Sequence, residues 1–260
     1  DLDWGISLNT PTLYIFAISH YCEKVRWALD YLAIEYDLVH LAPGLHISVA
    51  QRLGAKATSV PILVANEQVL QGSAAIIDWA ESQCQNGHRL TDSDHRDAYQ
   101  TLEKRLDDLA GVHTRRYFYS EALVEQPATV RAIFTHDLPL HQRLITRAIW
   151  SKVRVKMIKA MDLGAQQGEE SRAIVERELL WLESQLEDGR SFLLGDKFSR
   201  ADIAAASLFA PLAVPQQHPC VDLITLPPRL ATVTEAWHER PAMRWIRDLY
   251  KEYRQRPAAL

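Results

Sequence analysis

The chain is poor in cysteine, and its three cysteines, Cys22, Cys84 and Cys220, lie far apart in the sequence. An odd number of widely spaced thiols does not build a disulfide framework, so we expect a reducing compartment, the cytoplasm. The chain also lacks an apolar run of about 20 residues, the length that spans a bilayer. Its first residues show neither a basic nor an apolar segment, so we expect no secretory signal.

Positive charge is scarce relative to negative charge. The 260 residues include 29 Lys and Arg against 33 Asp and Glu, which gives a net charge of −4 at pH 7. Proteins that bind nucleic acid are usually basic, so we expect no nucleic-acid partner. The ten histidines show no spacing that is typical of a metal site. His136 and His141, for example, do not share a helical face, and we expect no metal.

A short apolar run, residues 13–18, leads directly into a turn that contains Ser19 and Cys22. The run is typical of a buried strand, and residues 23–32 predict an amphipathic helix with Cys22 on its apolar side. A hydroxyl and a thiol therefore lie at a helix N-terminus. Free N–H groups and the helix dipole favour an anion there, such as a thiolate. We interpret the turn as the floor of a pocket for a small thiol.

Further segments predict a small mixed sheet. Residues 35–40 read as a strand that is joined to the first strand through a helix, so we expect this pair to be parallel. Residues 59–70 alternate around a turn and predict an antiparallel hairpin. A short helix over residues 45–53 lies between them. A further helix over residues 74–80 follows the hairpin, with Ser73 as its expected N-cap.

After a polar linker, residues 87–94, the sequence shows no evident strand. Apolar residues at helical spacing recur through this second half of the chain. They are Ala98, Leu102, Leu106, Leu109, Val175, Leu179, Leu182 and Leu186. Ser199 and Asp202 predict a capping box at the start of another helix. We therefore predict a first domain over residues 11–86 and an all-α domain over residues 95–260.

Residues 138–163 combine six cations with apolar side chains. At about 100° per residue, the arginines lie on one side of a straight helix and the lysines on the other. Such a helix has no clean apolar face, which argues against a membrane-surface helix and predicts a kink or a break. We expect a solvated helical segment along one side of a cleft, without stable membrane anchoring. Its positive charge favours anionic ligands.

Four motifs follow one another along the chain. They are Ser19 to Arg26, Val60-Pro61, Gly72 to Ile76, and Phe192 to Asp196 followed by Ser199 and Asp202. In these motifs, at these spacings, the chain resembles the glutathione S-transferase superfamily over nearly its whole length. The resemblance implies an α/β thioredoxin-like N-terminal domain with a mixed four-stranded sheet, and an all-α C-terminal domain. It also implies glutathione as co-substrate, a small apolar electrophile as second substrate, and a homodimer.

The resemblance also implies a role for each motif. Ser19 is expected to donate a hydrogen bond to the sulfur of glutathione, although an ordinary N-cap serine is the alternative. The implied glutathione-binding residues are Ser19, Ser59, Val60, Pro61, Gly72 and Ser73. The peptide bond before Pro61 is expected to be cis. Gly72 departs from the family motif, in which an acidic residue or Gln precedes the serine; here Gln71 stands one position earlier.

The second substrate is expected to contact Tyr21, His113, Arg116 and Tyr117, and Tyr119 is a further aromatic candidate on the same helix. Core or interface packing is the alternative for the residues on this helix. Cys22 is expected to be a buried apolar side chain, with a redox thiol as the alternative. Two other functions therefore remain open. One is a glutathione-dependent peroxidase or thiol-exchange enzyme that uses Cys22. The other is a module of the same fold that binds glutathione or an apolar ligand without catalysis.

Overall fold

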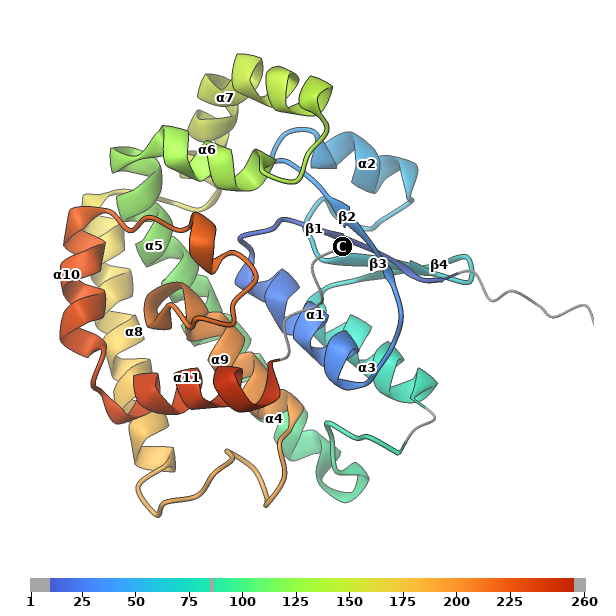
Figure 1. The fold of residues 1–260 in the computed structure, drawn as a ribbon, viewed down its shortest axis with the longest axis vertical. Coiled ribbons are helices and arrows are strands. Elements are labelled where there is room, and N and C mark those ends of the chain that lie inside the picture. The colour runs from blue at the N-terminus through green and yellow to red at the C-terminus, as the bar shows by residue number, and fades with distance from the viewer. Residues whose placement is uncertain (1–9, 85–86, 255–260) are drawn as a thin grey trace, which may run out of the picture.

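The computed structural model describes residues 10–84 and 87–254. The ends of the two predicted domains, residues 85–86 and 255–260, lie outside these ranges. The described chain has two parts, a small sheet with helices on both faces and a larger helical part beside it (Figure 1).

The sheet of the described chain has four strands. They are β1 (Thr12–Ile15), β2 (Asp37–His40), β3 (Ile62–Ala65) and β4 (Gln68–Gln71). The strand order is β2-β1-β3-β4, with β1 parallel to β2 and antiparallel to β3. β3 and β4 form a hairpin that turns at Asn66 and Glu67, both with positive φ angles. The predicted mixed sheet is therefore confirmed.

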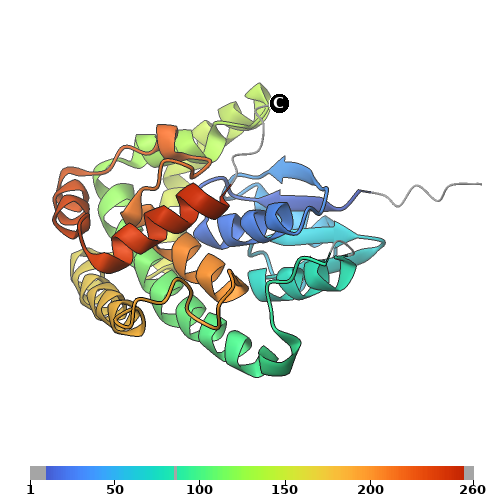
Figure 2. The ribbon, with the colours of Figure 1, turned by 60° about the horizontal axis from the view of Figure 1, so that its bottom comes forward.

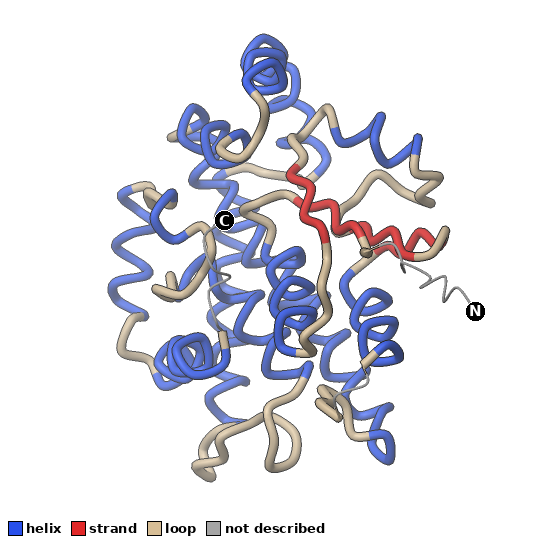
Figure 3. The backbone as a smooth tube through the Cα atoms, turned by 45° about the vertical axis from the view of Figure 1, so that its right-hand side comes forward, coloured by secondary structure: helices blue, strands red, loops and turns tan. Residues whose placement is uncertain are grey.

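Helices cover both faces of this sheet. They are α1 (His20–Tyr31), α2 (His46–Arg52) and α3 (Ser73–Gln83). α2 lies on one face, and α1 and α3 lie on the other (Figures 1 and 3). Cys22, Val25 and Leu29 point from α1 into the core and are almost fully buried. They recur at helical spacing, which is why this segment forms a helix against an apolar sheet.

The second part of the described chain is helical throughout. It contains α4 (Arg96–Arg105), α5 (Val112–Glu125), α6 (Pro127–Thr135), α7 (Leu140–Ala160), α8 (Ala165–Gln185), α9 (Arg200–Ala213), α10 (Pro228–Trp237) and α11 (Pro241–Tyr253). A π-helical turn, Leu106–Gly111, joins α4 to α5 without a loop. α9 is the central helix, and α1, α5 and α11 pack around it. Figure 2 shows α11 beside α1, where the rings of Trp27 and Tyr250 are 4.4 Å apart.

The predicted capping box at the start of α9 is confirmed. The carboxylate of Asp202 accepts hydrogen bonds from the backbone N–H and from the hydroxyl of Ser199, at 2.9 and 2.7 Å. Its other oxygen accepts from the N–H of Leu193 at 2.8 Å. These bonds satisfy donors at the helix start and tie the preceding loop to it.

α7 runs as one continuous helix from Leu140 to Ala160, so the predicted break is wrong. The prediction overlooked that two apolar strips lie between the two rows of cations. The inward strip contains Thr146, Trp150 and Val153, and the outward strip contains Leu140, Leu144 and Val155. The inward strip is buried, so this segment packs as one continuous helix. Within residues 10–84 and 87–254, none of the helices is long and apolar enough to cross a bilayer.

Buried ion pairs join the two parts of the molecule. Lys24 Nζ on α1 lies 2.8 Å from a carboxylate oxygen of Glu103 on α4, whose other oxygen lies 2.6 Å from Arg200 on α9. Both cations are fully buried, and each has a further partner, Asp107 for Lys24 and Asp78 for Arg200. Buried charges require such pairing, so this cluster fixes α1 and α3 against the helical part.

Candidate active site

Ser19 lies where β1 ends and α1 begins. It is the N-cap of α1, and its Oγ accepts a hydrogen bond from the Cys22 N–H at 3.4 Å. This contact is long for an N–H···O bond, so it restrains the hydroxyl only weakly. The Ser19 side chain lines a cavity at the helix N-terminus. The hydroxyl and the helix dipole therefore both favour an anion above this turn.

The Cys22 side chain points away from that cavity into the core. Its exposed fraction is 1%. Burial raises the pKa of the Cys22 thiol to about 11, an effect that the nearby Ser19 hydroxyl only partly offsets. The thiol is therefore protonated at neutral pH, and a protonated, buried thiol is a poor nucleophile.

The loop that leads into β3 forms a second side of the site. The Val60–Pro61 peptide bond is cis, as the resemblance implied. Ser59 and Val60 line the cavity. The side chain of Gln71 holds this loop in place, because its amide donates to the carbonyl oxygens of Ala57 and Ser59, both at 2.7 Å. Gln71, which does not line the cavity, thus supports the loop that does.

Gly72 and Ser73 form the start of α3. Gly72 is the N-cap of the helix and Ser73 its first residue, so the helix begins one residue earlier than predicted. Gly72 has φ 90° and ψ 149°, and its N–H donates to the carbonyl of Pro61 at 3.1 Å. Ser73 is largely buried. The helix start and the cis-proline loop are therefore directly connected.

A cavity of about 610 Å³ opens over Ser19, between the two parts of the molecule. The β1–α1 turn and the loops next to β2 and β3 form one side, and α5, α6 and α7 form the other. Its apolar lining includes Phe16, Ile18, Tyr119, Phe134, Ile149, Val153 and Met157. The rings of Phe16 and Phe134 meet edge to face with centroids 5.4 Å apart. This size and lining are typical of a small-molecule site.

His20 and Tyr21 connect the site to the π-helical turn. His20 Nε2 lies 3.1 Å from the carbonyl oxygen of Gly111, and the Tyr21 hydroxyl donates to the carbonyl of Asp107 at 2.7 Å. A Cβ at Gly111 would overlap the Tyr21 ring. Burial lowers the pKa of His20 to about 3, so its ring is neutral. The sequence does not reveal this role of His20, because the role depends on how the π turn packs against α1.

Of the four residues predicted to contact the second substrate, the structure places Tyr21 in the cavity lining and the others elsewhere. His113 Nδ1 lies 3.1 Å from a serine hydroxyl on α8. Arg116 is paired with Asp162. Tyr117 is 3% exposed and packs within the helical part. These three residues therefore make contacts within the helical part and do not line the cavity, as the alternative of core or interface packing predicted.

α5 instead presents Arg115 and Tyr119 to the cavity. These residues are four positions apart and so share a helical face. A regular helical count from α4 does not find this face, because the π turn over residues 106–111 contains an extra residue and rotates the helix that follows. Lys152 and Lys156 of α7 also line the cavity, as the expectation of a basic helix beside a cleft suggested.

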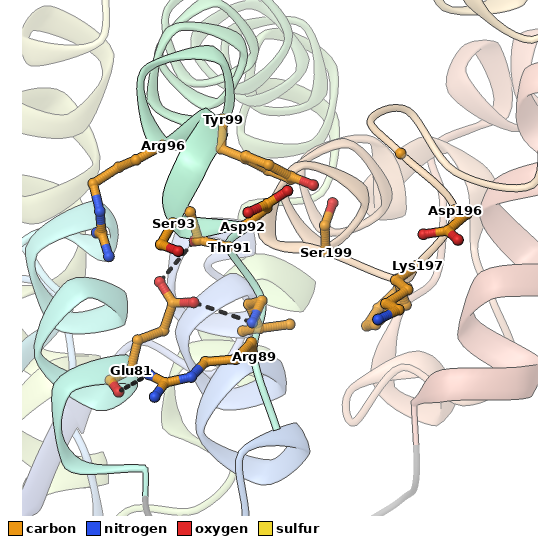
Figure 4. Close-up of a pocket in the computed structure, with 13 residues that line it drawn as sticks. Glu81, Arg89, Thr91, Asp92, Ser93, Arg96, Tyr99, Asp196, Lys197 and Ser199 are labelled. Atoms are coloured by element: carbon orange, nitrogen blue, oxygen red, sulfur yellow. Dashed lines mark hydrogen bonds between the residues drawn. The ribbon is translucent and has the colours of Figure 1, made fainter. Parts of the chain in front are cut away.

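A second cavity of about 530 Å³ lies at the junction of α3, α4 and α9 and shares no lining residue with the first. Figure 4 shows its polar side chains. The carboxylate of Glu81 already accepts from the N–H of Leu90 at 3.1 Å and from the Thr91 hydroxyl at 2.7 Å. Because this carboxylate is occupied in holding the linker, we assign the cavity over Ser19 as the candidate active site.

Comparison with known families agrees with this geometry. A sequence model of the glutathione S-transferase N-terminal domain matches residues 13–87, and one of the family's C-terminal domain matches residues 165–236. The chain therefore belongs to the glutathione S-transferase superfamily, with a thioredoxin-like domain followed by an all-α domain. No curated protein shows a significant match to the chain.

Solved structures show the same fold. Glutathione transferase GSTFuA3 from Phanerochaete chrysosporium has a TM-score of 0.65 and 17% identity, covering 95% of this chain and 98% of its own. CsGST63524 of Ceriporiopsis subvermispora, solved in complex with glutathione, has a TM-score of 0.60 and 16% identity, covering 96% and 100%. The beta-etherase LigF from Sphingobium sp. strain SYK-6 has a TM-score of 0.56 and 19% identity, covering 92% and 99%.

Proposed function

We propose that this protein is a glutathione transferase of the serine type, which conjugates glutathione to a small apolar electrophile. The observation that carries the proposal is the position of Ser19. Its hydroxyl lies at the N-terminus of α1 and faces a largely apolar cavity. A thiol bound there meets a hydrogen-bond donor and a helix dipole, and both stabilise its anionic form.

The required stabilisation is of a size that these groups supply. A free thiol has a pKa of about 8.5, and lowering it by about two units takes roughly 2.7 kcal/mol. A hydrogen bond to a charged group contributes about 1.5–3 kcal/mol. The Ser19 hydroxyl and the helix terminus together thus account for a thiolate at neutral pH. The proposed chemistry uses no metal.

The thiolate then attacks the electrophile in the apolar part of the cavity. With an aryl chloride, the sulfur forms a bond to the ring carbon that carries chlorine, and the carbon–chlorine bond breaks. Chloride leaves with the bonding electron pair, and the proton of the thiol has passed to solvent. Holding both reactants above one turn supplies proximity in addition to activation.

Glutathione is proposed to extend from Ser19 along the cis-proline loop to the start of α3. In this pose Val60 pairs with its cysteinyl main chain, and the N-terminus of α3 at Ser73 binds the γ-glutamyl carboxylate. Similar structures with bound glutathione support this ligand. From the family resemblance and the low cysteine content of the chain, we also propose that the protein acts in the cytoplasm as a homodimer.

Thiol exchange or peroxide reduction through Cys22 is less favoured. Its thiol is 1% exposed, and burial raises its pKa to about 11. A reactive thiol needs access and a low pKa, and Cys22 has neither.

The proposal is tested by calorimetric titration with reduced glutathione and by conjugation of 1-chloro-2,4-dinitrobenzene, using Ser19→Ala and Cys22→Ala. We expect glutathione binding with proton release near neutral pH. Loss of one hydrogen bond to a thiolate predicts a fall in kcat/KM of about 10- to 100-fold for Ser19→Ala. Glutathione affinity should change little, because most of the tripeptide binds elsewhere.

Cys22→Ala serves as the matched control, and its conjugation rate should remain that of the native protein. An active Ser19→Ala variant together with an inactive Cys22→Ala variant would replace the transferase proposal by thiol chemistry. If the protein does not bind glutathione at several millimolar, the transferase proposal fails. The remaining function would be a non-catalytic module of the same fold that binds a different ligand.

A further inference from the structure

The lining of the cavity over Ser19 contains cations but no carboxylate. Arg115 enters from α5, and Lys152 and Lys156 enter from α7, whereas neither aspartate nor glutamate is among the lining residues. The described residues provide no ion-pair partner for any of the three. Three unpaired cations beside an apolar surface make the cavity attractive to an anion.

Arg115 is the most informative of these cations. Its Nε is buried and has no hydrogen-bond partner within the described chain. The neighbouring Arg116 is paired with Asp162, and the fully buried Lys24 and Arg200 are also paired. An unpaired buried donor is costly, so an unpaired guanidinium at a cavity wall points to a ligand that brings its own acceptor.

The proposed pose of glutathione does not use Arg115. Its anchoring residues, from Ser19 through Val60 to Ser73, all belong to the thioredoxin-like domain. Arg115 projects from the opposite wall, beside Tyr119, whose ring is stacked on that of Phe134 with centroids 6.2 Å apart. A guanidinium next to flat aromatic surfaces matches a planar ligand with an anionic end.

We propose that the second substrate is an aromatic electrophile that carries a carboxylate or a sulfonate, and that Arg115 binds this anionic group. Lys152 and Lys156 on α7 attract the anion at the wall of the cavity, and the aromatic side chains hold its ring. This inference rests on the proposed function, because it identifies the substrate class of the same site. Arg115 is then a specificity-determining residue.

Direct binding tests the inference without any turnover. The probes are 8-anilinonaphthalene-1-sulfonate and N-phenyl-1-naphthylamine, which share their rings and differ in the sulfonate. Fluorescence titrations use the native protein, Arg115→Gln, Arg115→Lys and Lys159→Gln, a control for a cation on α7 outside the cavity. We expect Arg115→Gln to weaken the sulfonate about tenfold or more and the neutral probe less than about twofold. Arg115→Lys should keep most of the preference, and Lys159→Gln all of it.

Equal loss of both probes in Arg115→Gln would overturn the inference, as would a native protein that binds both probes equally. If Arg115→Gln fails to fold, as judged by circular dichroism, the affinities for the sulfonate and the neutral probe are compared in Arg115→Lys and in a Lys152→Gln/Lys156→Gln variant instead. Loss of the sulfonate preference in the double lysine variant supports an anion-selective cavity. Retention of the full preference in both variants contradicts it.

Turnover separates this inference from the proposed function. The matched substrates are 1-chloro-2,4-dinitrobenzene and 4-chloro-3,5-dinitrobenzoate, both of which release chloride on conjugation. Arg115→Gln should raise KM for the benzoate about tenfold and leave KM for glutathione within about twofold. A raised KM for glutathione alone would assign Arg115 to the co-substrate and overturn the inference. If neither compound is conjugated and glutathione does not bind, the transferase proposal fails, whereas the probe titrations still decide the anion preference.

Discussion

At the scale of single residues, Gly72 shows how the backbone dictates a departure from a family motif. Its angles, φ 90° and ψ 149°, lie in a region that is essentially restricted to glycine. A side chain at this position meets no neighbouring atom within 4 Å, so space is not the constraint. An acidic residue before Ser73 would therefore strain the turn itself. The glycine is explained by local geometry and does not imply a lost glutathione site.

We predict that Gly72→Ala lowers the free energy of unfolding by about 1–3 kcal/mol, the usual cost of a forbidden backbone conformation. The cost should arise although the new methyl group has room. Urea unfolding measures it, with Ser73→Ala as a control that leaves the backbone of the turn unchanged. A Gly72→Ala variant as stable as the native protein would show that the turn relaxes freely to another conformation.

The residues proposed for the glutathione side could be located from the sequence because they belong to contiguous motifs with local causes. Ser19 caps a helix, and Val60 and Pro61 precede a strand, so strand and helix signals place them. Arg115 was not predictable in this way. Its function depends on which side of α5 meets α7 and the β1–α1 turn, and that is decided by tertiary packing.

At the scale of elements, the π turn over residues 106–111 determines how the β1–α1 turn docks on the helical domain. Two of its carbonyl groups contact side chains of α1, that of Asp107 with Tyr21 and that of Gly111 with His20. The extra residue also rotates α5, so a regular helical count from α4 does not give the face of α5 that lines the cavity. Sequence periodicity alone does not reveal such an insertion.

We predict that Gly111→Ala destabilises the protein by about 1–3 kcal/mol, because its methyl group overlaps the Tyr21 ring and overpacks the junction. The predicted fall in kcat/KM follows from the displaced β1–α1 turn. A double-mutant cycle with Tyr21→Phe isolates the contact, since removal of the hydroxyl relieves part of the overlap. Strictly additive losses would indicate that Gly111 acts on the helix rather than through Tyr21.

The way in which α7 packs could be predicted only in part from its sequence. Counting charges around the helix placed the cations correctly on two sides, yet it missed the buried strip at Trp150 and Val153. This strip anchors the helix to its neighbours, and Lys152 and Lys156 next to it line the cavity. The functional expectation of a basic cleft wall agrees with this arrangement, whereas the predicted break in the helix was wrong.

At the scale of the whole molecule, the two domains are joined by charges as well as by apolar packing. Glu103 bridges Lys24 of the first domain and Arg200 of the second, and all three side chains are at most 2% exposed. The amino-acid composition does not reveal this buried cluster, because in the sequence each of its residues looks like an ordinary surface charge. The partners of a buried ion lie far apart in the sequence and become evident only from the fold.

We predict that Glu103→Gln lowers the free energy of unfolding by about 3 kcal/mol, because it leaves two buried cations with fewer partners. Calorimetry and hydrogen exchange on α1 and α9 measure this loss. Exchange should increase first at the domain junction, whereas the sheet remains protected. Lys104→Gln, which removes an exposed ion pair on the same helix, is the control. Equal effects of the two variants would assign no special role to the buried cluster.

The charge of α7 affects how the molecule orients itself near a charged surface. Residues 140–160 carry six cations and no carboxylate, although the whole chain has a net charge of −4. The molecule therefore carries a strongly positive helix although its net charge is negative. Near an anionic surface it turns α7 and the adjoining cavity toward that surface before any contact is made. Its retention on an ion-exchange column thus depends on the orientation of one helix as well as on net charge.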